Sequence, residues 1–356
     1  MVGSCEPTIL ITGGAGFIGA NLVHLAVSTG FKVVNLDALT YAGNKANLET
    51  LNGNPRHVFV HGSITDRKLV ESILTKERPS AILNLAAESH VDRSIDGPAI
   101  FMETNVMGTL TLLDLAKTYY ANLPSNERSR FRLIHVSTDE VFGSVEEGAS
   151  TEDSRYEPNS PYAASKAGAD HLVRAFGKTY GLPVIITNCS NNYGPYQFPE
   201  KLIPVMILSA LEGVSLPVYG DGRQIREWLH VLDHSRALLL VLEKGEPGDK
   251  YNIGSEARIE NIELVRTICT LLQEVKPSSL GRRYVELIEM VSDRPGHDRR
   301  YALDSSRIRE RLGWKPEINL TEGLKQTIRW YLSHVEWWTT IRTERYGGER
   351  LGTFHA

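Results

Sequence analysis

The stretch Gly13-Gly14-Ala15-Gly16-Phe17-Ile18-Gly19 lies between a short apolar run, Thr8 to Thr12, and a helical pattern that begins at Phe17. Its three spaced glycines permit a tight turn, let a diphosphate approach backbone N–H groups and allow the helix to pack against the strand. A glycine triplet alone is not decisive, because such turns also occur for packing alone. The strand before it and the helix after it favour a dinucleotide-binding turn.

The chain beyond this turn alternates short apolar runs with longer helical patterns. We expect the first strand to be followed by others at residues 32–36, 57–60, 81–85, 131–137 and 184–188. Continuous apolar strands separated by helices are typical of a parallel sheet that is covered on both faces. The sequence therefore predicts the α/β class, with a doubly wound parallel sheet of the Rossmann type.

Asp37 follows the second expected strand, 24 residues after Gly13. A carboxylate at this place accepts hydrogen bonds from an adenosine ribose and repels a 2′-phosphate, which favours NAD over NADP. The alternative is a helix cap or a turn former. Small residues at Leu85-Ala86-Ala87, after the fourth expected strand, leave room for such a cofactor at the carboxyl edge of the sheet.

Regularity weakens after Asn188, where prolines and glycines divide the chain into short elements. We expect residues 1–190, with a return segment near 228–256, to form the NAD-binding Rossmann domain. Residues 191–227 and 257–345 are expected to form a smaller C-terminal α/β cap domain. Residues 341–356 match no pattern that we can interpret.

Composition and charge narrow the classes of partner. The 356 residues include 39 Lys and Arg against 43 Asp and Glu, a net charge of −4, so nucleic acid is not expected as a partner. No apolar run approaches the roughly 18 residues that span a bilayer, and the first residues lack a signal-peptide pattern. Cys5, Cys189 and Cys269 lie far apart, which fits reduced thiols. We expect a cytoplasmic protein that has no membrane partner and no metal site.

Tyr162 and Lys166 are four residues apart in a helical pattern that Asn159 or Ser160 caps and Pro161 begins. This spacing places both side chains on one helix face, where a lysine ammonium lowers the pKa of a neighbouring phenol and makes it a usable base. Ser137-Thr138-Asp139-Glu140 follows the fifth expected strand, at the edge where a doubly wound sheet places its ligand crevice. We expect these groups to converge.

Taken together, these features resemble the extended short-chain dehydrogenase/reductase superfamily over nearly the whole chain. Within it, Thr138-Asp139-Glu140 resembles the signature of the dTDP-glucose 4,6-dehydratases, where the related 4-epimerases carry small hydroxyl residues. Further similar stretches are Ala86-Ala87-Glu88-Ser89-His90-Val91-Asp92-Arg93-Ser94, Ser190-Asn191-Asn192-Tyr193-Gly194-Pro195-Tyr196, Phe198-Pro199-Glu200-Lys201-Leu202-Ile203-Pro204 and Asp293-Arg294-Pro295-Gly296-His297-Asp298-Arg299-Arg300-Tyr301.

The resemblance implies an NAD-dependent lyase that converts dTDP-glucose to dTDP-4-keto-6-deoxyglucose. Tyr162, supported by Lys166, takes the C4 hydroxyl proton while hydride passes to NAD⁺, and Thr138 steadies the C4 oxygen. Glu140 then removes the C5 proton as Asp139 protonates the departing C6 hydroxyl, and the hydride returns to C6. One carboxyl group must therefore be ionised while its neighbour is protonated.

The resemblance also implies two sets of binding residues. The NAD set is Gly13, Gly16, Phe17, Ile18, Gly19, Asp37, Ser63, Ile64, Leu85, Ala86, Ala87, Thr104, Tyr162, Lys166 and Asn191. The nucleotide-sugar set is Ser89, Thr138, Asn191, Lys201, Leu202, Arg226, Asn261, Arg294 and His297. In the second set, Arg226 and Arg294 are expected to face the diphosphate, because guanidinium forks suit phosphate oxygens.

Ser63 departs from the family pattern, since relatives usually carry Gly-Asp-Ile where this chain has Gly62-Ser63-Ile64. The aspartate would accept a hydrogen bond from the adenine amino group. We therefore expect a weaker hold on NAD or a shifted adenine.

Two alternatives stay open at this point. One is a UDP-glucose 4,6-dehydratase or another nucleotide-sugar epimerase or decarboxylase, and the other is a noncatalytic NAD-binding regulator, against which the intact catalytic residues argue. Helical patterns at 100–120 and 162–180 are expected to pack across the two-fold axis of a homodimer, although a monomeric core explains the same periodicity.

Overall fold

The computed structural model describes residues 6–279, 281–293 and 296–347, and within these residues the central feature is a seven-stranded sheet. Its order is β10-β6-β5-β4-β1-β2-β3, and every neighbouring pair is parallel. The strands are β1 (Thr8–Thr12), β2 (Lys32–Asp37), β3 (His57–His61), β4 (Ala81–Asn84), β5 (Arg132–Thr138), β6 (Val184–Cys189) and β10 (Lys250–Ile253). The predicted α/β class and doubly wound sheet are confirmed, with strand ends within one residue of those expected.

Helices cover both faces of this sheet because successive strand residues point to opposite sides. Ile9 and Ile11 of β1 pack towards α1 (Phe17–Ser28), α9 (Val231–Lys244) and α11 (Ser306–Leu312). Leu10, between them, packs towards α2 (Arg67–Glu77), α5 (Thr109–Ala121) and α7 (Pro161–Tyr180). The strands are therefore apolar on both faces, which explains their continuous hydrophobic runs.

Helix α7 begins as the sequence indicates. Ser160 is the N-cap, and its Oγ accepts a hydrogen bond from the Ala163 N–H at 3.1 Å, while Pro161 occupies the first turn. The helix ends at Gly181, which adopts a left-handed conformation. Shorter elements near it are α3 (Val91–Asp96), α4 (Pro98–Phe101), a π-helical segment (Met102–Gly108), α6 (Ser125–Arg128) and the 3₁₀ segments Lys45–Leu51, Asp139–Phe142 and Tyr284–Leu287.

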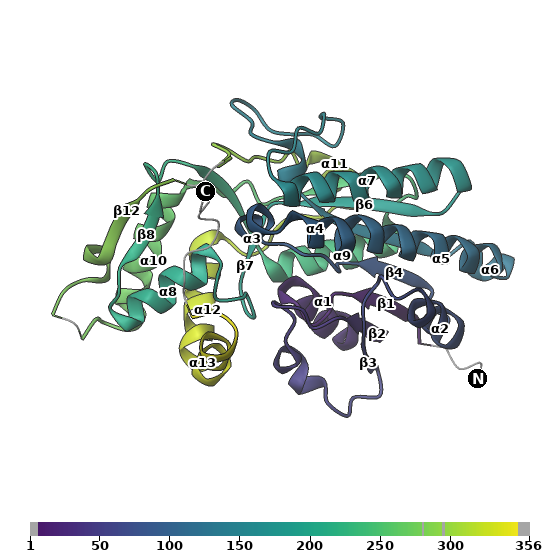
Figure 1. Ribbon diagram of the computed structural model, residues 1–356, viewed down its shortest axis with the longest axis horizontal. Helices are drawn as coiled ribbons and strands as arrows, with labels where there is room; N and C mark the ends of the chain where they lie inside the picture. The colour runs from purple at the N-terminus through teal and green to yellow at the C-terminus, as the bar shows by residue number, and fades with distance from the viewer. Residues whose placement is uncertain (1–5, 280, 294–295, 348–356) are drawn as a thin grey trace.

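A smaller lobe lies beside one end of the sheet (Figure 1). Its elements are β7 (Asn191–Tyr193), α8 (Leu202–Glu212), β8 (Leu216–Tyr219), β9 (Ile225–His230), β11 (Arg258–Glu260), α10 (Asn261–Val275), β12 (Ile288–Val291), α12 (Leu320–Ser333) and α13 (Val335–Glu344). Helices α8, α10 and α12 bury a separate apolar core. The chain leaves this lobe after β9 and returns to the large sheet through α9 and β10.

The sheet positions the site through its topology. β1 pairs with β2 on one side and with β4 on the other, so the chain winds in opposite directions from this point. In such sheets the crevice for a ligand opens at the carboxyl ends of the strands that flank the switch. Among the residues that the structure describes, no helix is both long and apolar enough to cross a membrane.

Candidate active site

A cavity of about 550 Å³ opens at the carboxyl ends of the central strands and is lined from both the large sheet and the smaller lobe. It brings together residues as distant in sequence as Gly13 and His297. Every predicted catalytic, cofactor-binding and substrate-binding residue within the described ranges lines it. Arg294, the remaining prediction, lies outside the described residues.

The glycine loop at one end of the cavity has the shape of a phosphate cradle. A Cβ atom on Gly19 would lie 2.1 Å from the Gly13 carbonyl oxygen, so close packing alone requires that glycine. On Gly16 the nearest contact would be 3.4 Å away, which packing tolerates. Gly16 is the N-cap of α1 and provides no side-chain cap, so the first N–H groups of the helix remain for a ligand in the cavity.

Asp37 lies beside this loop and is buried. Its Oδ2 accepts a hydrogen bond from the Ala15 N–H at 2.8 Å, and its Oδ1 accepts one from the Leu39 N–H at 2.7 Å. Burial raises the pKa of Asp37, while these backbone hydrogen bonds oppose the shift. The Gly16 N–H is a third backbone donor to Asp37, and the remaining lone pair of the carboxylate can accept a ribose hydroxyl.

Thr138 ends β5, and the 3₁₀ turn that follows carries Asp139 and Glu140. The Thr138 hydroxyl donates to Asp139 Oδ1 at 3.2 Å and accepts from the Glu140 N–H at 3.3 Å. Burial raises the pKa of Asp139 well above its ordinary value, and the charges of Glu140 and Glu227 add to the effect. Burial therefore favours the protonated form of Asp139, which is what a proton donor in this pair requires.

Tyr162 and Lys166 lie one turn apart on α7, and both side chains line the cavity. Burial raises the pKa of Tyr162 well above its ordinary value, and the charge of Glu140 adds to this. The Lys166 ammonium donates to the Val136 carbonyl oxygen at 2.7 Å. The support of Tyr162 by Lys166 as a base stays a prediction.

The smaller lobe adds polar groups on the opposite side of the cavity. Asn191 and Asn261 each have a buried side-chain oxygen with no hydrogen-bond partner among the described residues. Such orphaned acceptors fit a ligand that brings donors, such as a sugar or a base. The Arg226 guanidinium lies over the Tyr301 ring, with its Cζ atom 4.3 Å from the ring centroid. It also donates a hydrogen bond to the Asp298 carbonyl oxygen at 2.9 Å.

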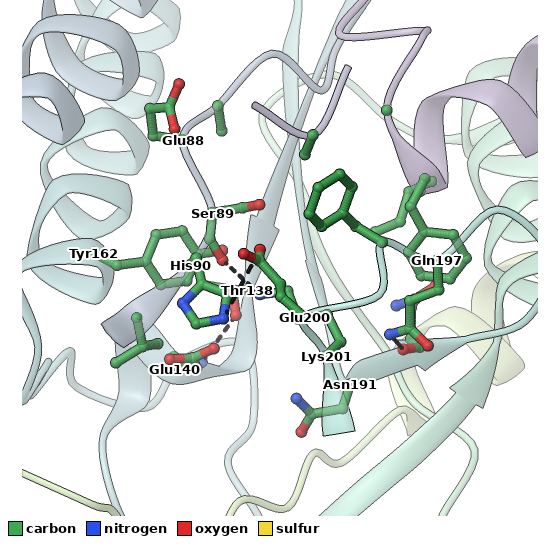
Figure 2. Close-up of a pocket in the computed structure, with 18 of the residues that line it drawn as sticks. Glu88, Ser89, His90, Thr138, Glu140, Tyr162, Asn191, Gln197, Glu200 and Lys201 are labelled. Carbon is green, nitrogen blue, oxygen red and sulfur yellow. Dashed lines mark hydrogen bonds and ion pairs between the residues drawn. The ribbon is translucent and has the colours of Figure 1, made fainter. Parts of the chain in front are cut away.

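Other predicted groups are held by neighbours. Lys201 donates to the Ser89 carbonyl oxygen at 3.2 Å, which joins the smaller lobe to the loop after β4. His297 Nδ1 lies 2.6 Å from Asp293 Oδ1. Figure 2 shows Thr138, Glu140 and Tyr162 on one side of the cavity and Gln197 on the other, with Glu200 and Lys201 between them.

Several cavity residues are missing from the sequence prediction. His90 and Glu200 lie in stretches that carry the resemblance, so the motif itself was the available signal. Glu200 is enclosed and pairs with Arg93 at 3.1 Å. Tyr41 and Tyr346 meet in an apolar cluster with Phe198 at the edge of the cavity. Nothing in the sequence pattern indicates Tyr346. It lies at the cavity because the residues at and after the end of α13 pack against Phe198.

Comparison with known proteins shows which family the chain belongs to. The family model described as GDP-mannose 4,6 dehydratase matches residues 10–327. A dTDP-glucose 4,6-dehydratase of Xanthomonas campestris pv. campestris (strain B100) is 55% identical over 346 residues, which cover 97% of this chain and 99% of the relative. The chain belongs to the dTDP-glucose 4,6-dehydratase family. A further member, dTDP-glucose 4,6-dehydratase 1 of Escherichia coli (strain K12), is 51% identical over 95% of this chain and 96% of its own length.

Solved structures of the dTDP-glucose 4,6-dehydratase family share the fold. The enzyme of Streptomyces venezuelae, solved with NAD and TYD bound, is 46% identical, has a TM-score of 0.85 and covers 94% of this chain and 99% of its own. The enzyme of Bacillus anthracis, in complex with NAD, is 44% identical with a TM-score of 0.84, covering 94% of this chain and 100% of its own. The resemblance to the extended short-chain dehydrogenase/reductase superfamily is confirmed.

Proposed function

We propose that this protein converts dTDP-glucose to dTDP-4-keto-6-deoxyglucose with NAD as its cofactor. Family membership supports this reaction. One observation at the site supports its elimination step in particular. Asp139 and Glu140 are adjacent at the cavity, and burial raises the pKa of Asp139, which favours its protonated form. An enzyme that only oxidised and reduced the sugar would need no buried carboxylic acid beside a second carboxyl group.

The side chains divide the work. The glycine loop and Asp37 would hold NAD⁺, which would supply the hydride acceptor. Tyr162 takes the C4 hydroxyl proton, and Thr138 holds the C4 oxygen through its hydroxyl. Glu140 removes the C5 proton once C4 is a ketone, because only then can the adjacent carbonyl take up the negative charge. Asp139 gives its proton to the C6 hydroxyl, which leaves as water. The hydride taken from C4 then returns to C6 and a proton is added at C5, which gives the 4-keto-6-deoxy sugar.

Incubation with dTDP-glucose and, in parallel, with UDP-glucose tests the function. We expect a 4-keto-6-deoxy product, read by its alkali-dependent absorbance, to form faster from dTDP-glucose. Product only from UDP-glucose would make the chain a UDP-glucose dehydratase, and a change of configuration at C4 without loss of water would make it an epimerase. NAD binding without any turnover would favour the regulator.

Ser63 provides a prediction on cofactor retention. It lines the cavity, and its Oγ lies 2.8 Å from the Thr65 hydroxyl and accepts from the Thr65 N–H at 3.1 Å. This hydroxyl is therefore engaged locally, and Ser63→Asp adds a charged acceptor for the adenine amino group. We expect NAD to dissociate about tenfold more slowly, the effect of one charge-assisted hydrogen bond.

The rate of NAD loss into excess competitor measures this effect. Thr65→Ala is the matched control, because it removes the local partner of Ser63 without adding an acceptor. An unchanged rate in Ser63→Asp would mean that Ser63 does not face the adenine.

We also propose a homodimer. Ile100, Met102 and Met107 are large apolar side chains that are 47%, 41% and 53% exposed along α4 and the π-helical segment. Tyr180, at the end of α7, is 54% exposed. Light scattering should give about twice the chain mass of 39.7 kDa. Met107→Glu should shift this towards the monomer, because burying a charge in an apolar interface is costly; an unchanged mass would exclude Met107 from the interface.

We infer two domains with separate tasks. Residues 1–190, with the return segment near 228–256, hold NAD, and residues 191–227 and 257–345 hold the nucleotide sugar. The separate apolar cores of the large sheet and the smaller lobe support this division, except that α11 (Ser306–Leu312), within the proposed cap, packs against the large sheet. The buried, unpaired thiols of Cys189 and Cys269 fit a cytoplasmic location. Cys5 lies outside the described residues.

A further inference from the structure

Asp170 lies on α7 one turn beyond Lys166, beneath the catalytic surface. It is 2% exposed and is not among the residues that line the cavity. A carboxylate in this position is expensive to bury unless other groups compensate its charge. The proposed reaction gives Asp170 no direct task, because it reaches neither substrate nor cofactor.

The contacts of Asp170 converge on the peptide that holds Lys166. Asp170 Oδ2 accepts from the Ser137 hydroxyl at 2.8 Å and from the Tyr156 hydroxyl at 2.7 Å, and Oδ1 lies 3.4 Å from His135 Nε2. His135 and Ser137 are the neighbours of Val136 on β5, and they point to one face of the sheet. The Val136 carbonyl between them accepts the Lys166 ammonium. Asp170 thus holds Ser137 on one side of that carbonyl by a hydrogen bond and lies beside His135 on the other side.

A chain of buried side chains sets the tautomer of His135. The Thr12 hydroxyl donates to Asn84 Oδ1 at 2.7 Å, which leaves the Asn84 amide nitrogen, 3.1 Å from His135 Nδ1, as a donor. His135 Nε2 then carries the hydrogen that faces Asp170. Burial lowers the pKa of His135, and the charge of Lys166 lowers it further, so the imidazole is neutral near pH 7. His135 therefore does not neutralise Asp170.

The charged neighbours that remain around Asp170 are lysines. Burial alone would raise the pKa of Asp170, but His135, Lys166 and Tyr156 lower it, so the carboxylate is ionised. Burial lowers the pKa of Lys166, and Asp170 opposes this shift. The charge of Asp170 also acts to raise the pKa of Lys250, on β10, against the effect of burial.

Other titratable groups face the same region. Cys189, on β6, has a thiol whose pKa burial raises to about 12, so it carries no charge near neutral pH. Asp139, Glu140 and Tyr162 interact on the cavity side. Asp170 is therefore the ionised group on the sheet side that stabilises a charged Lys166.

We propose that Asp170 is a positioning residue, the buried counter-ion that keeps Lys166 protonated and fixed on the Val136 carbonyl beside Tyr162. This inference rests on the proposed function, because it assigns Lys166 the task of supporting the base Tyr162. Asp170 acts through Lys166 and through the β5 backbone.

The pH dependence of C4 oxidation tests this role. Asp170→Asn keeps the size of the side chain and removes its charge, and Tyr156→Phe removes one hydrogen bond to the carboxylate but keeps the charge. Each substitution is added to the Asp139→Asn, Glu140→Gln double variant. In that variant elimination is blocked, so the reduced nicotinamide that accumulates in a single turnover reports C4 oxidation alone. We expect Asp170→Asn to move the alkaline limb of the profile to lower pH by about one unit, a tenfold easier loss of the Lys166 proton.

Tyr156→Phe should leave the alkaline limb in place. An unmoved limb in Asp170→Asn, or an equal shift in Tyr156→Phe, would overturn the proposal, because a purely structural role predicts no difference between the two. The shift should persist when Lys250→Met is added. Its disappearance there would assign the effect to Lys250 and would equally overturn the proposal.

Thermal unfolding gives a second readout that does not depend on activity. Lys166→Met leaves Asp170 without one of its cations and should lower Tm. Adding Asp170→Asn should raise Tm above that of Lys166→Met alone, because the stranded charge is removed. A double variant no more stable than Lys166→Met would overturn the counter-ion role. This comparison holds even if Asp170→Asn alone does not fold or if dTDP-glucose is not the substrate.

Discussion

Asp139→Asn combined with Glu140→Gln should stop the loss of water while C4 oxidation continues. The variant removes the acid and the base of the elimination, and it leaves Tyr162, Lys166 and the glycine loop unchanged. We expect the 6-deoxy product to form at least about a hundredfold more slowly, the usual effect of losing general acid and base catalysis. Reduced nicotinamide and the 4-keto-glucose intermediate should accumulate in a single turnover with dTDP-glucose.

The two single variants, and the NAD content of each protein, are the controls for this separation of oxidation from dehydration. Amides preserve the size of both side chains, so general collapse of the site would appear as lost NAD or a lowered Tm. If oxidation and dehydration fell by equal factors with binding intact, the two carboxyl groups would not be specific to elimination. Near-normal 6-deoxy product would remove them from the mechanism altogether.

The same residues determine the pH dependence of elimination. Burial raises the pKa of Asp139, so its acid form persists to higher pH than that of an ordinary aspartate. The elimination rate in the wild type should fall as pH rises through that raised pKa, because the proton for the C6 hydroxyl is then lost. Oxidation in the double variant should not show this limb.

Tyr162→Phe should slow C4 oxidation by about a hundredfold or more, because it removes the oxygen that accepts the hydroxyl proton. The ring is kept, and with it the edge-to-face contact with Phe101, whose ring centroid is 6.3 Å away. Rapid-mixing absorbance of reduced nicotinamide in the first turnover measures the effect.

Tyr119→Phe is the matched control for this variant. Its hydroxyl donates to the Pro79 carbonyl oxygen at 3.0 Å, and Tyr119 does not line the cavity. It should oxidise dTDP-glucose at close to the wild-type rate. Near-normal turnover of Tyr162→Phe would remove Tyr162 as the base.

Local patterns in the chain determine most of the sheet. The apolar runs from Thr8 to Asn188 become strands within one residue of their predicted ends, because a strand buried on both faces leaves a continuous hydrophobic run. The turn from Gly13 to Gly19 is similarly local, since its geometry excludes side chains at short range. β10 is less evident, because its four residues acquire their place only by pairing with β6.

Motifs predict the positions of the catalytic side chains, whereas tertiary packing sets their pKa values. Thr138, Asp139 and Glu140 follow β5 in the sequence, but only the structure shows that Asp139 is enclosed and that Glu140 and Glu227 raise its pKa. The helical spacing of Tyr162 and Lys166 was equally readable. The partner of Lys166 was not, because the Val136 carbonyl lies on a strand 30 residues earlier.

By itself, the sequence determined the doubly wound fold, the family and the catalytic side chains of the cavity, because strand and helix periodicity and short motifs are local properties. Tertiary structure alone decided that Tyr346 reaches the cavity, that Lys166 binds the Val136 carbonyl and that His135 and Asp170 meet beneath it. The reason is physical: desolvation and charge pairing depend on groups that come together from several elements, and no single stretch of sequence carries them.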